Sequence, residues 1–79
     1  MMDKVRELQE MIDALVVAIP RERAARAFYM DLMKRATSET SRGIFLYLAE
    51  QEKLHEAKLT AMLAELKADL ELARLKEKK

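Results

Sequence analysis

Apolar side chains recur at alternating steps of three and four residues along most of the chain. The first series is Leu8, Met11, Leu15, Ala18, Ala25, Tyr29, Leu32 and Ala36. The second is Phe45, Leu48, Leu59, Met62 and Leu66, and it continues with a small drift to Leu70 and Ala73. Side chains at these spacings lie on one face of an α-helix. The pattern therefore predicts two amphipathic helices, over about residues 3–36 and 39–76.

A polar run at residues 37–41 separates the two series and predicts the turn between the helices. Ser38 is suited to cap the second helix, and the negative charge of Glu39 is favourable in the first turn of that helix. Two helices joined by a short turn form an antiparallel hairpin. Pro20 lies inside the first series and is expected to kink that helix near residue 20. Because the apolar series continues past Pro20, we expect one bent helix.

The composition agrees with an all-α fold and a single domain spanning residues 1–79. The chain has 51% hydrophobic and 37% charged residues, with one glycine, one proline and no cysteine. A core formed by only 79 residues is marginally stable at best without disulfides. We therefore expect stabilisation by self-association or by a bound metal.

Charge and hydropathy argue against two classes of partner. Fifteen basic and 14 acidic residues leave a net charge of +1, which lacks the positive excess that attracts nucleic acid. Apolar runs such as residues 14–19 are far too short to span a membrane. We expect a soluble cytoplasmic protein that binds neither nucleic acid nor membranes.

Three ionisable residues interrupt the apolar series: Glu22 in the first helix, and Glu52 and His55 in the second. A carboxylate on a core face is costly unless it is paired or binds a cation. The midpoint between residues 22 and 52 is residue 37, in the predicted turn, so the two glutamates should face each other in an antiparallel hairpin. His55 lies one helical turn after Glu52 on the same face. The sequence therefore predicts that these three side chains converge.

A Glu from one helix and a Glu-x-x-His from the next make half of the ligand set that holds two iron or manganese ions in helical bundles. One hairpin supplies three ligands. Two hairpins related by a two-fold axis supply four carboxylates and two imidazoles, which suit a dinuclear centre. We therefore expect a homodimer or a higher even-numbered oligomer, in which the hairpins pack as a four-helix bundle.

Two stretches resemble signatures of the rubrerythrin-like branch of the ferritin-like superfamily, and most closely its half-length members, which dimerise to complete the bundle. Residues 22–29 match Glu-x-x-Ala-x-x-Phe-Tyr, and residues 48–55 match Leu-Ala-x-x-Glu-x-x-His. The resemblance covers about residues 14–66. Full-length members carry a second helix pair, and rubrerythrin carries a cysteine-ligated iron; this sequence contains neither.

The resemblance implies that Glu22, Glu52 and His55 are metal ligands and that Tyr29 lies near the metals. It implies a ferroxidase-type enzyme whose di-iron centre, shared by two subunits, oxidises Fe(II) with oxygen or peroxide in iron handling or oxidant defence. Manganese in place of iron, iron storage, and a protein-shell or electron-transfer partner are left open.

Simpler interpretations exist for these residues. Glu22 can pair with Arg26 across one helical turn. Glu56, one turn after Glu52, could be an outer-shell or entry-site carboxylate, but a solvated helix face is the simpler interpretation. The alternative function is a non-catalytic hairpin or coiled-coil module, in which Glu22, Glu52 and His55 fix the register and the oligomeric state. The two functions differ in whether these residues bind a metal.

Overall fold

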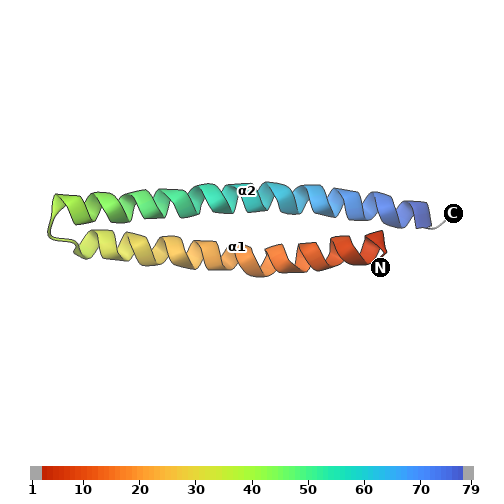
Figure 1. The fold of residues 1–79 in the computed structure, drawn as a ribbon, viewed down its shortest axis with the longest axis horizontal. Coiled ribbons are helices and arrows are strands. Elements are labelled where there is room, and N and C mark those ends of the chain that lie inside the picture. The colour runs from red at the N-terminus through yellow and green to blue at the C-terminus, as the bar shows by residue number, and fades with distance from the viewer. Residues whose placement is uncertain (1–2, 78–79) are drawn as a thin grey trace.

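The computed structural model describes residues 3–77 and shows two long α-helices joined by a short turn (Figure 1). Helix α1 spans Lys4–Arg35 and helix α2 spans Glu39–Glu77. The helices run antiparallel and side by side, and α2 extends past the start of α1 (Figure 1). This arrangement confirms the predicted all-α class and the antiparallel hairpin. Of the predicted domain 1–79, residues 1–2 and 78–79 lie outside the described residues.

Side-chain caps define where both helices begin. Asp3 caps α1, because its Oδ1 accepts a hydrogen bond of 2.8 Å from the backbone N–H of Arg6. Ser38 caps α2 as predicted, because its Oγ accepts from the N–H of Ser41 at 3.0 Å. The connection is therefore shorter than the predicted turn at 37–41: only residues 36–38 are non-helical.

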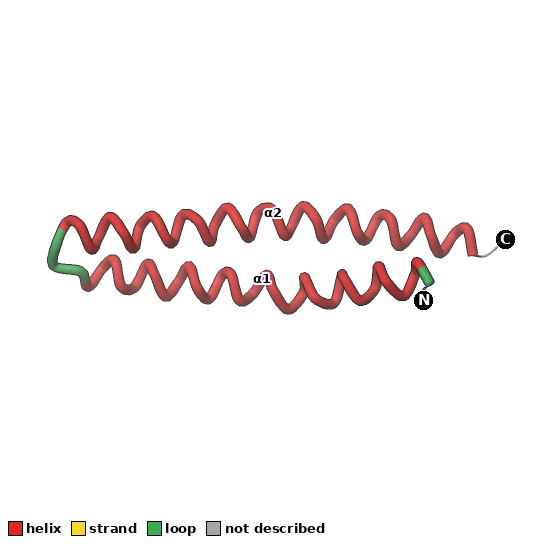
Figure 2. Tube along the Cα trace, in the orientation of Figure 1, coloured by secondary structure: helices red, strands yellow, loops and turns green. Residues whose placement is uncertain are grey.

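Pro20 lies inside α1, and the helix continues through it from Lys4 to Arg35. Proline removes one backbone hydrogen bond and crowds the preceding turn, which normally bends a helix. Figure 2 shows α1 bowing slightly away from α2 near its middle. The part of α1 that carries Glu22 is therefore continuous with the rest of the helix.

The hydrophobic core of one hairpin is small. Among residues 3–77, the buried hydrophobic side chains are Leu8, Ile12, Ile19, Ala49 and Leu70. Leu8, Ile12 and Leu70 form one cluster, toward the end of the rod that lies away from the turn. The rod measures 63 × 17 × 16 Å, so most side chains on both helices contact solvent.

The inner face of each helix is rotated by part of a turn from the predicted apolar series. Met11 and Met62, predicted on that series, are 49% and 50% exposed, whereas Ile12 is 6% exposed. Each helix carries apolar residues in two adjacent columns, one that packs against the other helix and one that faces outward. The spacing of apolar residues along one helix does not say which of the two columns packs against the other helix. The predicted series therefore combined residues of both columns.

We call the outward surface the open face, defined by two columns at seven-residue spacing: Met11, Ala18 and Ala25 on α1, and Leu48, His55 and Met62 on α2. A shallow groove lined by Met11, Leu15, Met62 and Leu66, among others, connects the two columns. The open face is thus a surface of the hairpin that combines apolar side chains with a histidine.

Neither helix, over residues 3–77, has a segment both long and apolar enough to cross a membrane.

Candidate metal centre

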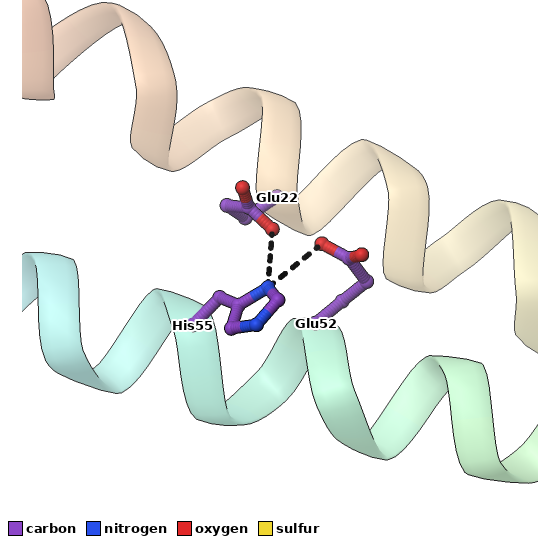
Figure 3. A group of neighbouring side chains, drawn as sticks. All are labelled: Glu22, Glu52 and His55. Atoms are coloured by element: carbon purple, nitrogen blue, oxygen red, sulfur yellow. Dashed lines mark ion pairs between the residues drawn. The ribbon is translucent and has the colours of Figure 1, made fainter.

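The structure brings Glu22, Glu52 and His55 together near the middle of the hairpin (Figure 3). Glu22 extends from α1, and Glu52 and His55 extend from consecutive turns of α2. Each side chain offers one donor atom, and these three atoms lie within 4.8 Å of one another. The convergence follows from the position of the turn, which sets residues 22 and 52 opposite each other.

The imidazole of His55 lies beside both carboxylates. Its Nδ1 is 3.6 Å from Oε2 of Glu22 and 3.8 Å from Oε2 of Glu52 (Figure 3). The side chain of His55 is 51% exposed, compared with 25% for Glu22 and 20% for Glu52. The carboxylates therefore lie between the helices, and the imidazole covers them from the open face.

Oε2 of Glu22 lacks a hydrogen-bond donor although it is buried. Among residues 3–77, no other buried side-chain oxygen or nitrogen lacks a hydrogen-bond partner. A buried acceptor with no donor is destabilising in a folded protein. A cation bound at this oxygen would remove that cost.

The pKa of Glu52 is raised above its ordinary value. The largest cause is that a proton on Glu52 can be shared with the facing carboxylate of Glu22, and burial and the negative charge of Glu22 act in the same direction. His55 acts in the opposite direction. A positively charged group is therefore favourable between the two carboxylates.

The donor set fits a transition-metal ion. Two carboxylate oxygens and one imidazole nitrogen suit iron, manganese or zinc. Donors bound to one such ion at about 2.0–2.2 Å lie about 3–4 Å apart, and the Nδ1–oxygen distances of 3.6 and 3.8 Å fall in that range. Three donors leave further coordination positions to be filled from outside the hairpin.

A second polar cluster lies beside this site, and its ion pairs were not predicted from the sequence. Glu56 accepts a hydrogen bond from Nε of Arg23, and its Oε1 lies 3.7 Å from Nη1 of Arg26. The Glu56 side chain is only 17% exposed, so the expectation of a solvated face is wrong. Arg26 pairs with Glu56, whereas Glu22 pairs with His55. Glu56 lies seven residues after Ala49 on α2, and the structure shows that Ala49 is buried.

Tyr29 lies seven residues after Glu22 on α1, or about 10 Å along the helix axis. It is half-buried, and its ring centroid is 5.6 Å from that of Phe28 at an interplanar angle of 60°. Tyr29 lies on the same side of α1 as Glu22, two turns away. Its role beside a metal stays a prediction.

A family model described as Rubrerythrin matches residues 13–79. The match includes Glu22, Glu52, His55 and Tyr29 and covers most of the chain. No curated protein and no solved structure matches the chain.

Proposed function

The chain belongs to the rubrerythrin family of ferritin-like proteins, and from that premise we propose that it is a di-iron ferroxidase-type protein that oxidises Fe(II) with oxygen or peroxide. Iron handling or oxidant defence in the cytoplasm is the corresponding cellular role. The observation that carries the proposal is the convergence of Glu22, Glu52 and His55 on one point, with a buried Glu22 oxygen that lacks a donor.

A second copy of the chain is the proposed partner, because one hairpin offers only three donors and one of them, His55, is half-exposed. Two hairpins packed through their open faces supply four carboxylates and two imidazoles. The same contact covers Met11 and Met62, which are about half-exposed in the single hairpin. Burial of these apolar side chains favours the association.

In this proposal Glu22, Glu52 and His55 would hold the iron, the glutamates through their carboxylates and the histidine through its imidazole. Bound iron would supply single-electron transfer to oxygen or peroxide. The four carboxylates of the paired site would make a multiply charged cation favourable there. Because the pKa of Glu52 is raised, metal binding releases a proton wherever Glu52 was protonated. Tyr29 is proposed as a nearby side chain.

Anaerobic loading with Fe(II), followed by exposure to oxygen or peroxide, tests the proposal. We expect stoichiometric Fe(II) binding and oxidation faster than in buffer alone, and loss of both in Glu52→Ala. Glu71→Ala is the control, since Glu71 is an exposed acidic residue of α2 outside the site. If the wild type neither binds Fe(II) nor accelerates its oxidation, yet still self-associates, the alternative role as an oligomerisation module is favoured.

A further inference from the structure

Arg26 is placed to neutralise a proposed ligand, yet it does not. Arg26 lies four residues after Glu22 on α1, and side chains at this spacing meet on a helix surface. An arginine beside a carboxylate commonly forms strong, charge-assisted hydrogen bonds. In the structure, however, Arg26 points to Glu56 of α2, and Oε2 of Glu22 is left without a donor.

Glu56 engages both nearby arginines. Arg23 donates to one of its oxygens, and Arg26 lies beside the other. At 17% exposure, its side chain is more buried than that of Glu22 or Glu52. Among the ion pairs of residues 3–77, those that join α1 to α2 all involve Glu56 or His55. The two arginine contacts thus link the helices at the same level as the three donors.

We propose that Glu56 is a positioning residue that holds Arg26 away from Glu22 and so keeps the Glu22 carboxylate free to bind a metal. The inference rests on the metal site proposed above. Without the charge of Glu56, Arg26 has Glu22 as its nearest carboxylate at helical i, i+4 spacing. A bound guanidinium then competes with the metal ion for the same oxygens, which lowers metal affinity while the hairpin still folds.

Variants at three positions separate this role from a simple structural one. Glu56→Gln keeps the size of the side chain and removes its charge. We expect Fe(II) affinity to fall about twofold to fivefold, the range that corresponds to an i, i+4 ion pair strengthened by charge-assisted hydrogen bonds. Arg26→Gln alone removes the competitor and should leave the affinity unchanged or raised. The double variant Glu56→Gln/Arg26→Gln should therefore recover the wild-type affinity.

Two matched controls test the specificity of the effect. Glu56→Gln/Arg23→Gln should stay as weak as Glu56→Gln, because residues i and i+1 do not face each other on a helix and Arg23 therefore does not compete at Glu22. Glu50→Gln removes an exposed carboxylate that lines the same groove as Arg23 and Arg26. Glu50→Gln should change Fe(II) affinity by less than Glu56→Gln does, because Glu50 forms no ion pair within residues 3–77.

The experiment is anaerobic calorimetric titration of the full chain with Fe(II), with circular dichroism and urea unfolding to confirm that each variant folds. Weak binding by Glu56→Gln that is rescued by Arg26→Gln supports the proposal. Equal weakening by Glu56→Gln and Arg26→Gln, or no rescue in the double variant, overturns it in favour of a purely structural pair. Unchanged affinity in Glu56→Gln also overturns it. A wild type that binds no Fe(II) refutes the proposed function itself, and this outcome is distinct from the others.

Discussion

Replacing Glu22 by glutamine is expected to stabilise the metal-free protein while it removes metal binding. Glu22 and Glu52 face each other with donor atoms no more than 4.8 Å apart. Repulsion between two unit charges at 4.8 Å is about 0.9 kcal/mol at the dielectric constant of water and about 3.5 kcal/mol at an effective value of 20. The Glu22→Gln variant loses this repulsion and gains an amide that can donate to Glu52.

The expected gain in the free energy of unfolding lies between these limits. The two carboxylate side chains are 25% and 20% exposed, so solvent screens the charges in part. We expect Glu22→Gln to raise the free energy of unfolding by about 1–2 kcal/mol. In a domain of this size each kcal/mol corresponds to roughly 4–8 °C in Tm.

Urea unfolding at neutral pH with a chelator present measures this difference at one fixed protein concentration. Glu71→Gln is the control, and removal of this exposed charge should change stability by less than about 0.5 kcal/mol. Addition of Fe(II) without oxygen should reverse the order, because ligand binding stabilises only the protein that retains the site. If Glu22→Gln destabilises the metal-free protein, the facing carboxylates are not a source of strain and this reasoning fails.

Three further predictions concern Glu52, His55 and Ile12. The raised pKa of Glu52 means that the folded protein holds a proton there more tightly than the unfolded chain. This contribution to stability is complete below the ordinary pKa of 4.5 and is lost as the pH rises through the raised pKa. The metal-free wild type should therefore lose stability with rising pH relative to Glu52→Gln in urea unfolding. An equal dependence of stability on pH in the two proteins would contradict this. His55→Ala should weaken Fe(II) binding at least about tenfold in calorimetry and change metal-free stability by less than about 0.5 kcal/mol, because the side chain is 51% exposed. Ile12→Ala should cost about 2–4 kcal/mol in urea unfolding, because Ile12 is 6% exposed in the main cluster, and a loss below about 1 kcal/mol would show that this cluster is not the core.

The two helices and the position of the turn were predictable from local properties of the sequence. The spacing of apolar residues set the helical period, and Ser38 marked the start of α2 through its hydrogen bond to Ser41. The rotation of each helix about its own axis was harder to predict, because apolar residues on two adjacent faces give one broad pattern. Met11 and Ile12 are both apolar and equally suited to a core, and only the packing shows that Ile12 is the buried one.

The convergence of Glu22, Glu52 and His55 was predictable because the turn fixes which residues face each other. The partner of each charge was not. A helical spacing of four residues favoured Glu22 with Arg26, but the structure pairs Arg26 with Glu56 across the hairpin. The partner of Arg26 depends on the position of α2 relative to α1. The spacing of residues within one helix gives no information about that position.

Assembly and metal binding are expected to depend on each other, and native mass spectrometry after anaerobic Fe(II) loading measures both in one experiment. The expected result is a dimer, or a multiple of it, that carries two iron ions for every two chains, with fewer bound ions and weaker association in Glu52→Ala. A monomer that binds iron stoichiometrically, or an oligomer that binds none, would contradict this expectation.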